Sequence, residues 1–301
     1  MNAAKHTPDD GAGIFYAAFA YAAWGVMPLY WRLLSSVPPF ELTVHRLVWC
    51  ALVVAGVTFA RGRAGQILAI IRQPRLFATL ALTSVLITIN WTVYIYCVAT
   101  HQLVEASLGY FINPFVSFAL GALVLGEHMS PFRIVAMALA AVAVAAQAIS
   151  IGHIPWIAPT LALSFGLYGY FRKLAPVDAL DGLTIETWVL FPITAGLVLF
   201  WWAQGTGAFP SVNLGKDALL LGGGPLTAIP LTMFAAGARR IKLTTLGFLQ
   251  YLSPSITLVL ATVFLGEKFT HVDAIAFGCV WAALLIVGVE GRVRWYRARP
   301  L

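Results

Sequence analysis

Ten runs of apolar residues, each about 18 to 23 residues long, follow one another along this 301-residue chain, and a helix of that length spans the ~30 Å hydrocarbon core of a bilayer. Hydrophobic residues make up 60% of the chain and charged residues 10%, whereas a soluble domain has about 25% charged residues. The charges are therefore too few to cover a water-exposed surface. The sequence predicts an all-α membrane protein with ten transmembrane helices. We expect these spans at residues 13–34, 40–60, 76–99, 104–126, 131–149, 154–171, 182–202, 217–238, 243–266 and 271–289.

The Lys and Arg residues are distributed unevenly between the connections, and cytoplasmic loops of membrane proteins hold the excess of such residues. Fifteen of the 19 fall on the side of the N-terminus, whereas Arg32, Lys216 and Lys268 fall on the other side and Arg46 lies within the second span. We therefore expect both termini in the cytoplasm. The net charge of +7 follows from this topology, and no RNA-binding signature accompanies it, so nucleic acid is not an expected partner.

Two segments of the chain, 140 residues apart, align without gaps. They read YFINPFVSFALGALVLGE (110–127) and QYLSPSITLVLATVFLGE (250–267), and they share a mid-span Pro and a final Leu-Gly-Glu. We interpret the match as an internal duplication with five spans in each half. Because five is odd, the second half enters the membrane from the opposite side, which predicts two inverted five-helix repeats, residues 1–150 and 151–301. Inverted repeats around a midplane site are a recurrent architecture of carriers that work by alternating access.

Five segments carry a more specific pattern. They are HRLVW (45–49), INWTVYIY (89–96), EASLGYFINP (105–114), SFGLYGYFRK (164–173) and GARRIKLTTLGFLQYLSP (237–254). Together they resemble the drug/metabolite transporter superfamily with its EamA-type repeats, and most closely its RarD-like subgroup. The resemblance implies export or exchange of small metabolites across a bacterial-type cytoplasmic membrane. It also implies a central cavity lined by the first, third, fourth, sixth, eighth and ninth spans.

Three ionisable residues, Glu41, His45 and Arg46, lie in the first two turns of the second span. Each such group costs at least ~2.5–3.5 kcal/mol in a bilayer core on insertion scales. One interpretation places Glu41 at the interface and lets Arg46 extend its guanidinium to the headgroups. The other makes His45 and Arg46 part of a polar network beside the transport path, with Glu41, Glu105 or a substrate as the partner of Arg46. We favour the second interpretation, and the first stays open.

Polar and aromatic residues also gather in the third and fourth spans. Asn90 and Tyr94 share a helical face with Trp91 beside them, and a buried Asn in a span either joins two helices or faces a cavity. We predict that these three residues and Tyr110 bind substrate, with the outer aromatic belt as the alternative for the third-span rings. Glu105 lies nearer the outer interface, where an interfacial or capping role competes with a functional one.

Corresponding positions of the fourth and ninth spans combine polar residues with proline. Asn113 directly precedes Pro114, and Gln250 and Tyr251 shortly precede Pro254. Irregular backbone at membrane depth is tolerated where it lines a cavity or is covered by protein. Paired interruptions of this kind are the best sequence pointer to the central site of a transporter. We therefore predict that Asn113, Gln250 and Tyr251 bind substrate or take part in gating.

Three further carboxylates lie in or beside the spans. Glu186 corresponds to His45 at an offset of 141 residues, so the two would lie at equal depths from opposite faces. We predict that this pair serves as proton sites or gates. Glu127 and Glu267 end their spans just after Gly, and we expect them to anchor helix ends and loops rather than to bind substrate.

No catalytic or nucleotide-binding motif accompanies these residues. The chain has no His-Glu-x-x-His, no Gly-x-Ser-x-Gly and no Gly-x-x-x-x-Gly-Lys-Ser/Thr, so neither an enzyme nor an ATP-driven pump is expected. Cys50, Cys97 and Cys279 lie inside apolar runs without the spacing of a metal site. We therefore expect no metal and no other cofactor.

The predicted function is that of a secondary transporter, an exporter or exchanger of small amphipathic metabolites or drugs in a bacterial-type inner membrane. A passive solute channel or a non-transporting membrane subunit is the alternative. The expected partners are a small-molecule substrate and the lipid bilayer. Coupling to protons or to a counter-substrate and assembly into a homodimer are left open by the sequence.

Overall fold

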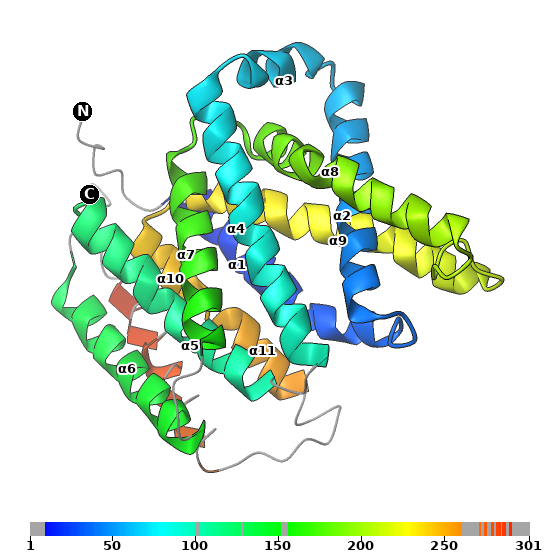
Figure 1. Ribbon diagram of the computed structural model, residues 1–301. Coiled ribbons are helices and arrows are strands. Elements are labelled where there is room, and N and C mark those ends of the chain that lie inside the picture. The colour runs from blue at the N-terminus through cyan, green and yellow to red at the C-terminus, as the bar shows by residue number, and fades with distance from the viewer. Residues whose placement is uncertain are drawn as a thin grey trace.

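The helices of the protein follow the apolar runs closely. The computed structural model describes residues 10–99, 103–127, 129–151 and 156–260, with short stretches between 271 and 290. These residues are mostly helical and contain no strand, which confirms the all-α class. The helices in Figure 1 are α1 (Gly11–Arg32), α2 (Pro39–Ala60), α3 (Ala64–Ile71), α4 (Pro74–Ala99), α5 (Leu103–Ala119), the π-helical turn η1 (Leu120–Val124), α6 (Pro131–Ile151), α7 (Ile157–Leu174), α8 (Ala179–Ala203), α9 (Leu214–Ala238), α10 (Leu243–Leu249) and α11 (Leu252–Val259).

Local sequence explains where several of these helices begin and end. Asp10, Asp178 and Asn213 precede α1, α8 and α9, and each accepts a hydrogen bond from a backbone N–H of the first turn. Gly62 and Gly205 follow α2 and α8 with φ of +68° and +65°, a conformation that residues with a Cβ adopt only under strain. The helix boundaries therefore depend mainly on short-range signals.

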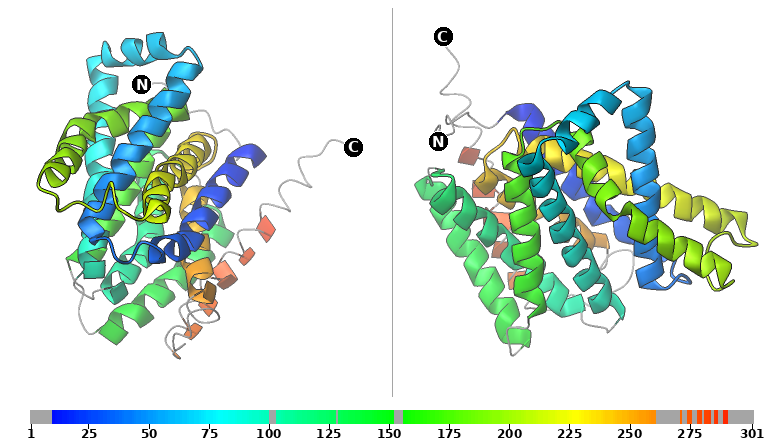
Figure 2. Two further views of the ribbon diagram at one scale, coloured as in Figure 1. Left: turned by 90° about the vertical axis from the view of Figure 1, so that its right-hand side faces the viewer. Right: turned by 45° about the horizontal axis from the view of Figure 1, so that its top comes forward.

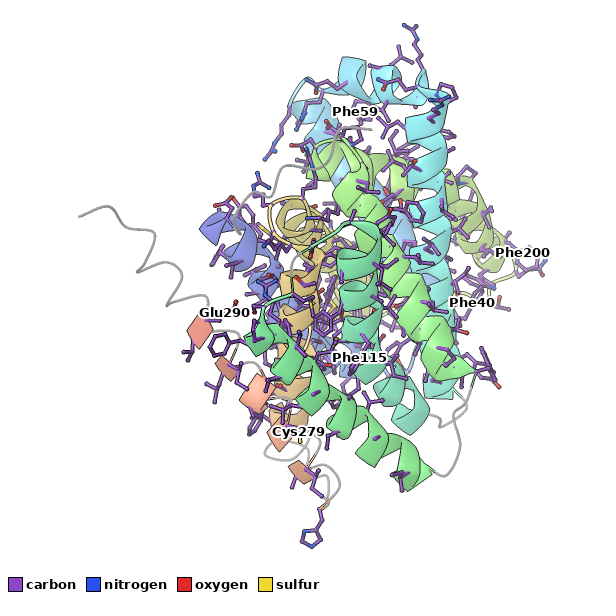
Figure 3. The ribbon with its side chains drawn as sticks, turned by 90° about the vertical axis from the view of Figure 1, so that its left-hand side faces the viewer. Phe40, Phe59, Phe115, Phe200, Cys279 and Glu290 are labelled. Atoms are coloured by element: carbon purple, nitrogen blue, oxygen red, sulfur yellow. The ribbon has the colours of Figure 1, made fainter. Side chains whose placement is uncertain are left out.

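Many large apolar side chains lie on the outside of the helix assembly. Phe40, Phe59 and Phe200 are each more than half exposed, and Phe40 and Phe200 lie at the periphery in Figure 3. Among the described helices, α1, α2, α4, α8 and α9 are long and apolar enough to cross a membrane. These helices and the exposed apolar side chains indicate a multi-pass membrane protein.

The two halves of the chain are interleaved. The most extensive helix packing joins helices of opposite halves: α5 with α7, α2 with α8 and α9, α1 with α9, and α4 with α7. In Figures 1 and 2, α4 and α7 lie between a group containing α2, α8 and α9 and a group containing α5, α6 and α10. A movement of one half relative to the other would therefore change contacts at the centre of the molecule.

Two features of the backbone differ from the sequence prediction. The connection of residues 61–75 contains α3, because its apolar residues pack on α4 and α8. The helix through Pro114 is continuous, and the irregular backbone of this span falls later, at η1. The ninth span is interrupted as expected, at Gln250 and Tyr251 between α10 and α11. The expected tenth span is described only in short stretches between 271 and 289, and Glu267 lies outside the described residues.

Candidate substrate site

Arg46 lies inside the bundle at a meeting point of four helices. Its Nε donates to Thr227 Oγ1 of α9 at 3.4 Å. Its guanidinium carbon lies 4.4 Å from the ring centroid of Trp31 on α1 and 4.8 Å from that of Trp91 on α4. The residue is half-buried. Both halves of the chain therefore hold this cation.

No carboxylate pairs with Arg46 among the side chains that the structure describes. Glu41 lies 3.6 Å from His45 Nε2 and accepts a hydrogen bond from the Ala208 N–H, so it is not the partner of Arg46. The side chain of Glu105, the other protein candidate, lies outside the described residues. The remaining described carboxylates have partners elsewhere: Asp10, Glu127, Asp178, Asp181, Glu186, Asp217 and Glu290.

Aromatic rings surround the rest of this region. Tyr94 and Tyr110 are in edge contact, with ring centroids 5.9 Å apart, and both lie near Arg46. The structure thus brings together Trp91, Tyr94 and Tyr110, which the sequence predicts as site residues, with Arg46. We call Arg46, Trp31, Trp91, Tyr94 and Tyr110 the Arg46 cluster. Trp31 was not predicted, although an aromatic residue near the end of the first span was a visible signal.

His45 lies next to Arg46 in sequence but faces another environment. Its ring stacks on Trp49 and contacts Phe209 in the α8–α9 connection, and its Nδ1 has no hydrogen-bond partner in the described part of the chain. Together with the contact between Glu41 and Ala208, these interactions hold the start of α2 against the α8–α9 connection. His45 therefore belongs to the contact between these elements and not to the Arg46 cluster.

Asn90 joins two helices. Its amide nitrogen donates to the Leu161 carbonyl at 3.0 Å and to Ser164 Oγ at 3.1 Å, and its side chain is fully buried. Of the two roles open to a buried Asn in a span, these contacts show the bridge between α4 and α7. Asn90 therefore positions α4, the helix that carries Trp91.

The residues of the fourth and ninth spans form a separate group. Tyr251 donates to the Phe111 carbonyl at 3.3 Å and so links the α10–α11 break to α5. Both amide atoms of Asn113 and Oε1 of Gln250 are buried, and no hydrogen-bond partner for them is present among the described residues. Buried polar atoms are normally paired in proteins, so these atoms are candidates for a partner supplied by water or by a solute.

A buried ion pair lies on the other side of Trp91. Arg172 Nε of α7 is 3.5 Å from Glu186 Oε1 of α8, and both residues are almost completely buried. Thr83 of α4 donates to the same carboxylate oxygen at 2.6 Å. At Gly182 an added Cβ would meet the guanidinium of Arg172 at 2.1 Å, so the absence of a side chain there makes room for the cation. The expected sixth span ends at residue 171, which places Arg172 in the following connection; in the structure Arg172 belongs to α7 and is fully buried.

A small cavity adjoins this ion pair. The cavity has a volume of about 10 Å³, which is enough for one water molecule. Ser84, Trp91 and Glu186 are among its lining residues. Trp91 therefore contacts Arg46 and also lines the cavity beside Glu186.

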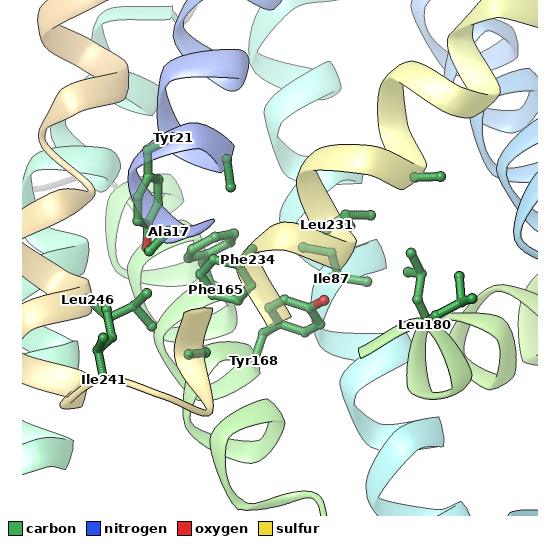
Figure 4. Close-up of a cluster of buried hydrophobic side chains, with 14 of the residues drawn as sticks. Ala17, Tyr21, Ile87, Phe165, Tyr168, Leu180, Leu231, Phe234, Ile241 and Leu246 are labelled. Atoms are coloured by element: carbon green, nitrogen blue, oxygen red, sulfur yellow. The ribbon is translucent and has the colours of Figure 1, made fainter. Parts of the chain in front are cut away.

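An aromatic cluster fills the bundle between α1, α7 and α9. Phe234 contacts Tyr21, Trp24, Phe165 and Tyr168, with ring centroids 5.3 to 5.9 Å apart. Figure 4 shows most of these side chains meeting at the crossing of their helices. We call these five residues the Phe234 cluster. These rings fill the space between the described parts of the three helices at this level.

Glu127 confirms one prediction in detail. Its two carboxylate oxygens accept from the backbone N–H groups of Leu243 and Thr244, at 2.7 and 3.0 Å. It thereby anchors the start of α10, as expected for a residue that serves a helix end. Within the described part of the chain, no three His, Cys, Asp or Glu side chains are grouped to hold a metal ion.

Comparison with known proteins assigns the chain to a family. The model of the EamA-like transporter family matches residues 11–147 and again residues 156–289. The chain belongs to the EamA-like transporter family. The two matches agree with the two-repeat layout, and the resemblance inferred from sequence is confirmed. The names of this family and of the YojE relative below are those of transporters rather than enzymes.

Several relatives of this EamA-like chain match it over nearly its full length. Protein RarD of Streptomyces exfoliatus is 42% identical, over 94% of this chain and 90% of the relative. The uncharacterized transporter YojE of Bacillus subtilis is 40% identical, over 95% and 96%, and protein RarD of Escherichia coli K12 is 37% identical, over 91% and 93%. A crystal structure with 18% identity superposes with a TM-score of 0.70 over 93% of this chain and 98% of the other, which supports the fold alone.

Proposed function

We propose that the protein is a secondary transporter that exports or exchanges small amphipathic metabolites or drugs by alternating access. In this proposal ten spans form two inverted repeats, residues 1–150 and 151–301, in a bacterial-type inner membrane with both termini in the cytoplasm. The observation that carries the proposal is the Arg46 cluster. Trp31 and Trp91 of the first half and Thr227 of the second half all contact Arg46, so a movement between the halves changes the surroundings of the cation.

The Phe234 cluster supplies a closed gate in this proposal. Trp24 and Trp31 are seven positions apart on α1, as are Thr227 and Phe234 on α9, which places the gate about 10 Å from Arg46 at 1.5 Å per residue. It lies toward the start of α1 and the end of α9, the side we assign to the cytoplasm. A solute beside Arg46 would reach the cytoplasm only after these rings separate.

In this proposal the contacts at the start of α2 form a second gate, at the opposite face of the membrane. Glu41 and His45 contact Ala208 and Phe209 of the α8–α9 connection, toward the other face of the membrane. The pair of Arg172 and Glu186 holds α7 to α8 near the first face. This arrangement supports the prediction that His45 and Glu186 belong to gates at opposite faces, with Glu186 also available as a proton site.

Counterflow in proteoliposomes tests the proposal. Vesicles loaded with unlabelled solute would receive labelled amino acids, small aromatic solutes or chloramphenicol-like amphiphiles, and saturable accumulation against the label gradient indicates a carrier. We expect Arg46→Ala to abolish this exchange. Arg61→Gln serves as the matched control, because Arg61 is exposed at the end of the same helix and has no ion-pair partner among the described residues.

The outcomes separate the competing functions. Saturable counterflow that Arg46→Ala loses and Arg61→Gln retains supports the carrier and its site. Flux that neither saturates nor shows counterflow supports a passive channel. The absence of flux for every solute, with correctly folded protein in the vesicles, supports a non-transporting subunit.

A further inference from the structure

We infer that the solutes of the Arg46 cluster are organic anions, in which a carboxylate binds Arg46 and a planar apolar group lies against the surrounding rings. This inference rests on the proposed function, because it names the solute class of the same site. It starts from the observation that no described carboxylate pairs with Arg46.

The guanidinium has more donors than the protein uses. An arginine carries five N–H donors, and the one on Nε points to Thr227 Oγ1 at a rather long 3.4 Å. The terminal nitrogens of Arg46 have no hydrogen-bond partner among the described residues. An unpaired cation within the bundle is unfavourable, and pairing with an anion relieves that cost. The planar fork of the guanidinium matches the two oxygens of a carboxylate.

The neighbouring rings favour this use of the cation. Trp31 and Trp91 lie at cation–π distance from the guanidinium, which stabilises the positive charge without consuming its N–H donors. The donors therefore stay available for a ligand while the side chain is held in place. Tyr94 and Tyr110 add aromatic surface close by. Flat apolar groups pack well on such rings, so the site suits an aromatic or similarly planar acid.

The same geometry disfavours neutral solutes. A neutral amphiphile can pack on the rings, but it leaves the charge of Arg46 uncompensated when the site closes around it. A carboxylate makes charge-assisted hydrogen bonds, each worth about 1.5–3 kcal/mol, which corresponds to about a 10- to 100-fold gain in affinity. An acid and its primary amide have nearly the same shape and differ mainly in these charge-assisted hydrogen bonds. Their affinities can therefore be compared directly.

Ligand binding to purified protein in detergent tests the inference without requiring transport. Phenylacetate and 3-phenylpropionate would each be titrated against the corresponding amide, with tryptophan fluorescence and the thermal melting midpoint as readouts. We expect wild type to bind each acid about 10- to 100-fold more tightly than its amide. Arg46→Gln should bind acid and amide equally, Arg46→Lys should keep a reduced preference, and the control Arg61→Gln should behave as wild type.

Equal or tighter binding of the amides by wild type, or no binding of either acid, would overturn the inference. An acid preference that survives in Arg46→Gln would also overturn it. If Arg46→Gln does not fold, the comparison of acids with amides on wild type still decides. Acid-specific binding without counterflow would refute the proposed transport but not the solute class. Counterflow of neutral solutes alone would support the proposed transport and refute the solute class.

Discussion

Gly224 allows α2 and α9 to approach each other closely, and Gly224→Ala should disrupt that contact. A Cβ at this position would lie 2.7 Å from the carbonyl carbon and oxygen of Trp49, against at least 3.4 Å for an ordinary contact. Because both atoms belong to the backbone, the helices must move apart by about 0.7 Å. Overpacking of this kind costs about 1–3 kcal/mol. The displaced segment of α2 also carries Arg46, three residues before Trp49.

Gly196→Ala in α8 is the matched control, because nothing lies within 4 Å of its added Cβ. Both substitutions receive the gain of up to about 1 kcal/mol that alanine gives a helix interior, so this term cancels in their comparison. We therefore expect Gly224→Ala to have a free energy of unfolding about 1–3 kcal/mol lower than Gly196→Ala. Titration with sodium dodecyl sulfate in mixed micelles, followed by tryptophan fluorescence, measures the difference. Equal transition midpoints would refute the close approach of α2 and α9.

Substitutions at two further buried carboxylates, Glu186 and Glu127, test the interactions that these groups make. Glu186→Leu leaves Arg172 buried without its carboxylate and should lower the free energy of unfolding by about 3–5 kcal/mol, whereas the double variant Arg172→Met/Glu186→Leu should recover most of this loss. Glu186→Gln should in addition flatten the pH dependence of transport, and an unchanged pH profile would exclude Glu186 as a proton site. Glu127→Ala removes the acceptor of two buried N–H groups at the start of α10 and should lower the free energy of unfolding by about 2 kcal/mol. Asn213→Ala at the exposed start of α9 should lower it by about 1 kcal/mol. Equal losses in the two variants would contradict the anchoring role of Glu127.

Much of the fold could be predicted because the responsible signals are local. The second span was expected at 40–60 and forms Pro39–Ala60, and the eighth was expected at 217–238 and forms Leu214–Ala238. The prediction missed α3, because an apolar stretch of eight residues is too short to span a membrane and becomes helical where it packs on other helices. It also placed an interruption at Pro114, where the helix continues.

The candidate site was predictable in its residue types more than in its partners. An Arg, a Trp and two Tyr residues stand out in apolar spans, and the structure brings Arg46, Trp91, Tyr94 and Tyr110 together. From the sequence, Glu41 was a candidate partner of Arg46, because the two residues are five positions apart at the start of the same span. In the structure Glu41 contacts His45 and Ala208 instead, because α2 directs Glu41 and Arg46 to different neighbours.

The amino-acid sequence by itself determined the class of the protein, the extent of its apolar helices and its family. These properties follow from composition, from runs of about 20 residues and from short-range helix signals, which act before distant parts of the chain meet. Only the tertiary structure decided which charges are paired. Thr227 lies 181 residues from Arg46, and Thr83 lies 103 residues from Glu186. Contacts over such separations depend on how the two halves interleave, and no local pattern in the chain encodes that arrangement.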